Sequence, residues 1–372
     1  MADVWVTNAG AGLQDGSSLA NAYAADDLAQ AMVDLSAAST GSILRICGDI
    51  TTTAAQTVSA AVADTTSDDT APKMVQGRDA ADTADARVTI TTAITTGAIL
   101  TLAGANEGIS GLVWRDITFD AEGKAGVDCL YWGASNFWDA HVFHRCAFLN
   151  GKIGCYALGT GKHVFNRCAF MGNASHGYSG GNSRGSADFF ACRMINNGGW
   201  GVTGMSLALQ LWFCVVSYNT SGGVNFVRHI NQCVAINCTI DHNGGPGIIF
   251  DVAFSQSLMS NSSAPMAINN LITSNGTYGI EFGCGDPSAA NYTEDLIAIE
   301  GNVLFGNISG TYAETGAYPP GLGAYVAANN TLAGSDPTYT DDTLAGGLDY
   351  SLPPGSAVIG EGLAVDVTDG AS

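Results

Sequence analysis

A repeat of nearly constant length is the feature that most constrains what this chain can fold into. Five segments follow one pattern and begin with a cysteine, at Cys146, Cys168, Cys192, Cys214 and Cys238. Successive cysteines are 22, 24, 22 and 24 residues apart, and two further copies follow at steps of 32 residues. These two copies begin with Asn270 and Asn302 in place of the cysteine. Such a period predicts a solenoid, in which each repeat stacks on its neighbours.

Each repeat has the same internal pattern. The residue two places after the cysteine is apolar, which is typical of a strand with one face directed inward. An asparagine follows five residues after the cysteine in six copies: Asn173, Asn197, Asn219, Asn243, Asn275 and Asn307. The first copy is one residue shorter, so we expect Asn150 to take this place. An earlier, weaker copy at 114–119 has Asp116 in the cysteine position.

The turns of the repeat have a physical explanation. Asparagine tolerates left-handed backbone angles and bonds to the nearby chain, and stacked asparagines can also bond to one another. A glycine follows most of these asparagines, and it suits a sharp bend. A coil of 22 to 24 residues has room for three short strands and three turns. Helical solenoids need about 33 to 47 residues per repeat, so we predict an all-β fold.

The repeat resembles that of the right-handed parallel β-helix superfamily, which includes pectate lyases and phage tailspikes. The resemblance covers residues 90–312 well, and it implies a single-chain solenoid with three strands per coil. It also implies a short helical cap at residues 1–40, a β-helix at 41–312 and a C-terminal cap segment at 313–372. We expect insertions near 60–86, 252–265 and 284–295. The fold itself specifies little about function.

The charge of the chain limits its partners. The net charge is −21, with 13 Lys and Arg against 34 Asp and Glu. Nucleic acids and anionic membranes attract basic surfaces, so neither is an expected partner. The opening Met1-Ala-Asp-Val carries no basic and apolar leader, and we therefore expect synthesis in a host cytoplasm without a signal peptide. We also expect no membrane span and no cofactor.

The cysteines and two histidines are candidate binding groups with simpler interpretations. We expect the five repeated cysteines to stack as buried free thiols, because free cysteine is commonly buried. His141 and His163 lie five residues before successive cysteines, so they should stack on adjacent coils. A metal site there lacks a visible third ligand, and we predict none.

One group of residues on the second strand of the repeat is typical of an enzyme. Asp251 and Glu281 should face outward on adjacent coils, offset by two residues, with about 8 Å between their Cα atoms. Such a spacing suits inverting glycoside hydrolysis, and Arg228 could bind a substrate carboxylate. In so acidic a chain, a solvated acidic surface is the simpler interpretation.

An outward apolar stripe follows the first strand of the repeat. It includes Leu149, Met171, Ile195 and Val215, and a stripe this long should be covered. A homotrimer would cover it, and so would the chain's own C-terminal segment.

We therefore favour a non-enzymatic structural protein of a phage virion, a capsid decoration protein or a spike, bound to a capsid or tail protein. The alternative is a polysaccharide-cleaving β-helix enzyme, a hydrolase or lyase, that acts on surface glycans and is virion-borne or extracellular.

Overall fold

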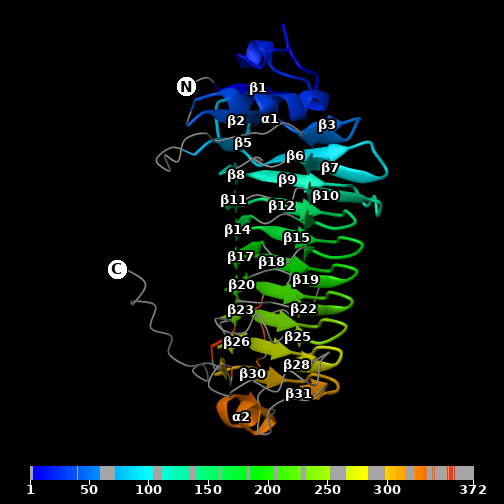
Figure 1. The fold of residues 1–372 in the computed structure, drawn as a ribbon, viewed down its shortest axis with the longest axis vertical. Helices are drawn as coiled ribbons and strands as arrows, with labels where there is room; N and C mark the ends of the chain where they lie inside the picture. Colours follow the sequence, from blue (N-terminus) through cyan, green and yellow to red (C-terminus); the bar gives the residue numbers. More distant parts are fainter. Residues whose placement is uncertain are drawn as a thin grey trace, which may run out of the picture.

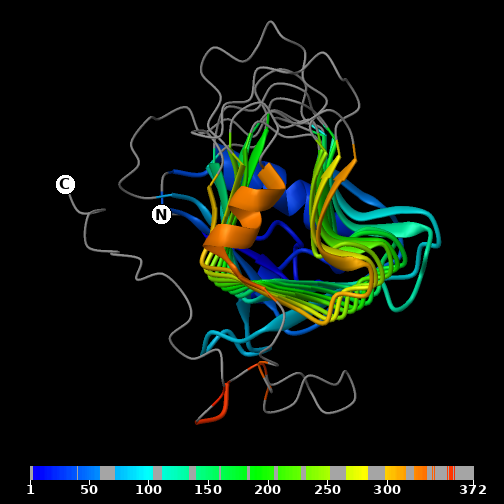
Figure 2. The same cartoon turned by 90° about the horizontal axis from the view of Figure 1, so that it is seen from below.

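The chain folds as a right-handed parallel β-helix, as the repeat predicts. The computed structural model describes residues 3–39, 41–58, 72–103, 111–133, 140–158, 161–181, 185–204, 208–227, 232–251, 265–283, 298–315, 322–332, 337, 339, 350, 352–354 and 356. The strands form three parallel sheets, which Figure 2 shows as three sides of one prism. We name them sheets I, II and III in the order in which each coil visits them.

Sheet I begins each coil and carries five-residue strands in its central part. Its strands are β1 (Val4–Val6), β2 (Ile43–Cys47), β5 (Met74–Arg78), β8 (Val113–Arg115), β11 (Ala140–His144), β14 (Lys162–Asn166), β17 (Ser186–Phe190), β20 (Ala208–Trp212), β23 (Gln232–Ile236), β26 (Pro265–Ile268) and β29 (Ala298–Glu300).

Sheet II follows after a tight corner and is built mostly from three-residue strands. Its strands are β3 (Ile50–Thr52), β6 (Val88–Thr92), β9 (Ile117–Asp120), β12 (Ala147–Leu149), β15 (Ala169–Met171), β18 (Arg193–Ile195), β21 (Val215–Ser217), β24 (Thr239–Asp241), β27 (Leu271–Thr273), β30 (Val303–Phe305) and β32 (Thr331–Leu332).

Sheet III completes the coil. Its strands are β4 (Gln56–Val58), β7 (Gly97–Leu102), β10 (Val127–Trp132), β13 (Cys155–Ala157), β16 (Tyr178–Gly180), β19 (Trp200–Gly204), β22 (Gly222–Val227), β25 (Ile248–Asp251), β28 (Tyr278–Gly283) and β31 (Gly310–Thr315).

The core consists of side chains that stack from coil to coil. Phe143, Phe165 and Phe189 lie on successive strands of sheet I, with ring centroids 4.9 Å and 5.0 Å apart. The repeated cysteines Cys146, Cys168, Cys192, Cys214 and Cys238 lie at the start of sheet II, each only 1% exposed. The cysteines among the described residues are free, so the thiols pack as small apolar groups.

The corner between sheets I and II needs one residue with left-handed backbone angles, which we call the left-handed corner residue. In the central coils it stands directly before the cysteine position, as with Arg145, Arg167 and Phe213 at φ +54°, +54° and +56°. The expected place of Asp116 is wrong. Ala147 pairs with Thr118, so Ile117 takes the cysteine position and Asp116, at φ +58°, is the corner residue.

The corner between sheets II and III holds the repeated asparagines as a buried ladder. The Asn219 Nδ2 donates to Asn243 Oδ1 at 2.9 Å and to the Met194 carbonyl at 3.0 Å. The left-handed residue here precedes the ladder asparagine, for example Tyr218 at φ +57°. Asn150 is also such a corner residue, at φ +56°, and Gly151 takes the ladder position instead.

The copies without cysteine use a second asparagine ladder. The Asn270 Nδ2 donates to Asn302 Oδ1 at 2.8 Å, and the Asn302 Nδ2 donates to Asn330 Oδ1 at 2.7 Å.

The glycine after the main ladder is required by the close approach of the next coil. A Cβ on Gly223 would lie 2.4 Å from the Gly247 carbonyl oxygen. This distance is too short for any residue with a side chain.

Helices cover the two ends of the stack (Figure 1). Helix α1 (Leu28–Ala37), which follows the 3-10 turns η1 (Leu19–Asn21) and η2 (Ala25–Asp27), packs against β1, β2 and β4, and α2 (Leu322–Asn329) lies at the other end. Neither helix in the described part of the chain is long and apolar enough to cross a membrane.

The predicted insertions are only partly described. Strand β5 lies inside the predicted insertion near 60–86, which is therefore not a loop throughout. The insertions near 252–265 and 284–295 lie outside the described residues, except that Pro265 begins β26.

Candidate functional site on the outer face of sheet I

One row of outward side chains on sheet I combines charged, polar and aromatic groups. It stands two residues before the cysteine position, where strand alternation directs side chains away from the core. Strand pairing places its central members next to one another in the order Arg115, His144, Asn166, Phe190 and Trp212. We call these five residues the outer row.

The outer row lies in the half of the chain that carries all the basic residues. The 13 Lys and Arg stand at or before Arg228, against 19 Asp and Glu in that part, which gives a net charge of −6. The remaining 144 residues contain no Lys or Arg and 15 Asp and Glu, which gives −15 and completes the total of −21. Anionic groups are therefore repelled least by the part of the surface that holds Arg115.

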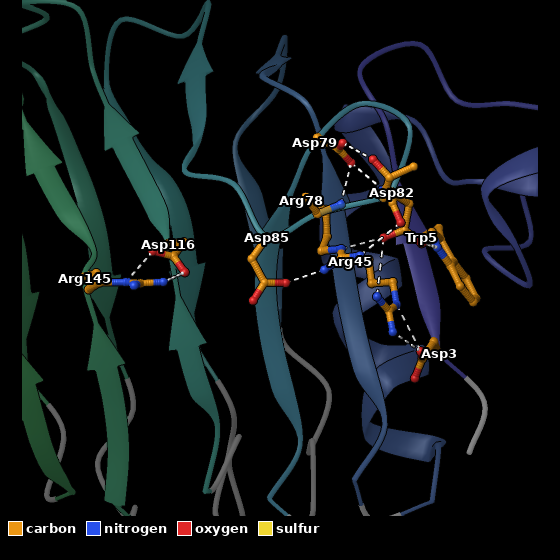
Figure 3. Close-up of polar contacts among 11 residues, drawn as sticks. Asp3, Trp5, Arg45, Arg78, Asp79, Asp82, Asp85, Asp116 and Arg145 are labelled. Atoms are coloured by element: carbon orange, nitrogen blue, oxygen red, sulfur yellow. Dashed lines mark hydrogen bonds and ion pairs between the residues drawn. The ribbon is translucent and has the colours of Figure 1, made fainter.

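The arginines nearest the N-terminus are engaged in ion pairs (Figure 3). The Arg45 guanidinium contacts Asp3 at 2.8 Å and Asp82 at 3.4 Å, and Arg78 contacts Asp82 at 2.7 Å. The Trp5 indole also donates to Asp82. These contacts join the N-terminal strand to the first coils, so we assign this network a structural role.

Further along the stack, Arg145 forms an ion pair, whereas Arg115 forms none with the residues that the structure describes. The Arg145 Nε donates to Asp116 at 2.7 Å, and a second nitrogen contacts the other carboxylate oxygen. Arg115 has no carboxylate within ion-pair distance among the described residues. Its charge is therefore available to an anionic ligand at this face.

His144 lies between Arg115 and Asn166 in the outer row. Partial burial, together with the positive charges of Arg145 and Arg115, lowers the pKa of His144 below its usual value. The imidazole is thus neutral near pH 7 and can accept a proton. A neutral base beside an unpaired arginine is a chemically competent pair.

Carboxylates on this face are too sparse for a two-carboxylate mechanism. Among the described strand residues after β5, sheet I has Asp188, which contacts Lys162 at 2.8 Å, and Glu300, which accepts from the Tyr325 hydroxyl at 2.7 Å. Four strand spacings separate β17 from β29, or about 19 Å. Glycoside hydrolysis needs about 5 to 9.5 Å between carboxyl groups, so these two cannot act together.

The predicted catalytic residues lie on another sheet. Asp251 pairs in register with Gly283, and Glu281 with Ile249, so the two residues lie on adjacent strands of sheet III at an offset of two residues. The Glu281 side chain is partly exposed. Arg228 lies outside the described residues. No part of this group lies in the outer row.

The predicted histidine stack exists and points inward. His141 pairs in register with His163, and the two side chains are 0% and 2% exposed. Both rings pack against Trp132, with centroids 4.1 Å and 4.6 Å away. Within the described part of the chain, no three metal-binding side chains come together.

The predicted apolar stripe on sheet II is interrupted. Leu149 and Met171 line a hollow of about 290 Å³. Ile195 is 0% exposed, so it is not part of the outward surface that the sequence predicted. Val215 is partly exposed.

Beyond Ile195 the chain covers its own sheet. The Tyr339 hydroxyl lies 3.1 Å from Thr273 Oγ1, and Tyr350 lies beside the buried Asp241. The described parts of this C-terminal segment lie outside sheet II in Figure 2. The C-terminal segment, the second of the two covers considered, therefore lies over the outer face of sheet II at β24 and β27.

Comparison with known proteins adds little to this site. No family model and no curated protein sequence matches the chain. Similar solved structures include the A-module of the Azotobacter vinelandii mannuronan C-5 epimerase AlgE4, at 13% identity and a TM-score of 0.49 over 83% of this chain and 96% of that one. A rhamnogalacturonan lyase is 8% identical, with a TM-score of 0.42 over 81% and 87% of the two chains. The pectate lyase Pel9A is 13% identical, with a TM-score of 0.39 over 96% and 89%.

The outer row is absent from the sequence-based candidates, although the sequence contains a signal for it. Four of its members, His144, Asn166, Phe190 and Trp212, stand two residues before a cysteine. Polar and aromatic side chains at a fixed outward position would have indicated a binding face.

Proposed function

We propose that this protein acts on an acidic polysaccharide, which lies along the outer face of sheet I and crosses successive strands. The observation that carries the proposal is the outer row, with unpaired Arg115 next to neutral His144 and polar Asn166. A uronate polymer offers a carboxylate for the arginine and hydroxyl groups for the amide. The similar structures are named as an epimerase and two lyases, which is compatible with this class of substrate.

The proposed chemistry is removal of the proton next to a sugar carboxylate. The His144 imidazole takes the proton, and the electron pair left on carbon is delocalised into the carboxylate, where Arg115 balances the added charge. Return of a proton to the opposite face gives an epimer. Cleavage of the bond between the neighbouring carbon and its glycosidic oxygen instead gives a double bond, and the oxygen leaves with the released chain end and takes a proton from water. Both outcomes share the first step.

Two readouts test this first step, because deuterium enters the sugar when a proton returns, whereas cleavage forms a double bond that ultraviolet absorbance detects. Purified protein is incubated in heavy water with mannuronan, polygalacturonate or rhamnogalacturonan, and deuterium next to the carboxylate is measured by NMR. We expect deuterium exchange or double-bond formation with one of them, and His144→Gln should slow it by roughly 100-fold or more, the usual contribution of a positioned base. Arg115→Gln should also slow it, because the developing charge loses its partner.

Arg193→Gln is the matched control, since Arg193 is an exposed arginine on sheet II. It should exchange at the unaltered rate. Absence of both deuterium exchange and double-bond formation with every polymer, or equal rates with His144→Gln, would contradict the proposal.

A virion structural role is the second candidate function. We propose it in the form of a homotrimer that decorates a capsid or forms a spike, because the hollow between Leu149 and Met171 is an apolar surface that a partner could fill. This role requires the purified chain to form oligomers, and light scattering measures their mass.

A further inference from the structure

The aromatic end of the outer row is a feature that proton abstraction does not use. Phe190 and Trp212 lie on adjacent strands with parallel rings, 6.3 Å between centroids and 11° between planes. Phe213 follows at the corner. Phe190 is 37% exposed and Phe213 is 56% exposed, and both are among the few large apolar side chains of the described residues that are open to water. We call Phe190, Trp212 and Phe213 the aromatic platform.

Phe213 is an unfavourable choice for the fold alone. It is a left-handed corner residue with φ +56°, and bulky residues rarely adopt such angles. Asn237 and Asn269 hold the same corner on the following coils, and asparagine suits the angle better. The left-handed backbone angles strain this phenylalanine, and its exposed ring gains little from burial. Its presence therefore points to a ligand.

We propose that the aromatic platform is a sugar-binding subsite that stacks the apolar faces of pyranose rings, an inference that rests on the proposed function for the path of the glycan. The negative face of an aromatic ring attracts the polarised C–H groups of a sugar face. Strands are about 4.8 Å apart, which is comparable to the length of one pyranose residue. Successive rings of one glycan can thus meet successive strands.

The position of the platform specifies which sugars it holds. From β11, which carries His144, β17 is two strand spacings away and β20 is three, or about 10 and 14 Å. The sugars on the platform are therefore two and three residues from the reacting one. No Lys or Arg stands on the described sheet I strands from β17 onward, so recognition there depends on ring faces rather than on sugar charge.

Binding as a function of glycan length tests the subsite. The inactive His144→Gln protein is titrated with uronate oligosaccharides from disaccharide to hexasaccharide by calorimetry. We expect affinity to rise with length, and adding Trp212→Ala should remove roughly tenfold of the hexasaccharide affinity while leaving the disaccharide unchanged.

Phe213→Asn separates binding from folding. It should raise the melting temperature, because the strained exposed ring is removed, and still weaken hexasaccharide binding. Ile308→Asn is the matched control, since Ile308 is 79% exposed at a distant corner, and it should leave binding unchanged. Full hexasaccharide affinity in both Trp212→Ala and Phe213→Asn overturns the subsite, as does a change in association state in place of glycan binding.

The two proposals fail in different ways. If deuterium exchange depends on His144 but hexasaccharide affinity is unchanged by Trp212→Ala, only the aromatic platform is ruled out as a subsite. If hexasaccharide binding depends on Trp212 but no polymer shows deuterium exchange or double-bond formation, the proton-abstraction function is ruled out and a glycan-binding surface remains.

Discussion

His163 is an ionisable residue that the core keeps uncharged. The ring is 2% exposed between Trp132 and Phe165, and burial lowers the pKa of His163 to about 4. In the unfolded chain a histidine has a pKa near 6.5, so the unfolded state binds the proton first. Stability is therefore fully present above pH 6.5 and falls as the pH drops toward 4.

At the same residue scale, the His163→Leu variant should lose this dependence. At pH 5 the wild-type protein should have lost about 2 kcal/mol of unfolding free energy through His163 alone. Denaturant unfolding at pH 7 and pH 5 measures the loss in both proteins, and the variant's should be smaller by that amount. Equal losses would show that His163 is not neutral in the fold.

At the scale of structural elements, the asparagine ladder fixes the corner between sheets II and III. The Asn219 amide accepts from the Asn197 backbone N–H at 3.1 Å and from the Asn197 Nδ2 at 2.8 Å, in addition to its two donated bonds. Each ladder side chain thus connects its own coil to the coils on both sides. The ladder also satisfies backbone groups that a tight corner would leave buried without partners.

Replacing Asn219 with leucine should destabilise the β-helix strongly. The change leaves several buried donors and acceptors unsatisfied, at about 1 to 3 kcal/mol each, so we expect a loss of at least about 3 kcal/mol. Chemical denaturation followed by circular dichroism measures it. Asn196→Gly is the control, because Asn196 is an exposed left-handed corner residue at φ +55°, an angle that glycine adopts without strain. A ladder variant as stable as this control would contradict the account.

At the scale of the whole molecule, assembly depends on how much of sheet II stays uncovered. The C-terminal segment protects the region of Asp241 and Thr273, which leaves the hollow of Leu149 and Met171 toward the middle of the stack. Burial of such an apolar surface is worth about 25 cal/mol per Å². If a second copy fills the hollow, light scattering should report a multiple of 38.1 kDa.

Met171→Asp should then reduce the assembly to single chains, because an unpaired carboxylate would be buried in the interface. Ile308→Asp adds the same charge at a distant exposed site and should leave the assembly intact. A wild-type monomer at micromolar concentration would contradict the trimer, while the polysaccharide proposal would stand.

The local spacing of residues by itself determined the fold class. Apolar residues at period two, followed by asparagine and glycine at fixed offsets, are compatible with one stacked-coil structure, and each coil repeats the same local solution. The inward direction of the cysteines and the stacking of His141 on His163 follow from this periodicity alone. Local reasoning was wrong by one residue at Asp116 and Asn150, because left-handed corners shift the register and can be located only from strand pairing.

Only the tertiary structure decided which outward positions are exposed and close enough together to form a binding face. The outer row is dispersed over about a hundred residues of sequence, and its members become neighbours because parallel strands align them. The burial of Ile195 and Asp241 could not be read from their own repeats, since their local pattern is that of exposed residues. Tyr339 and Tyr350, which lie against this face, are remote in sequence. Periodicity specifies which side of a strand faces the core, but contacts between distant segments decide which outward side chains remain exposed and available to a ligand.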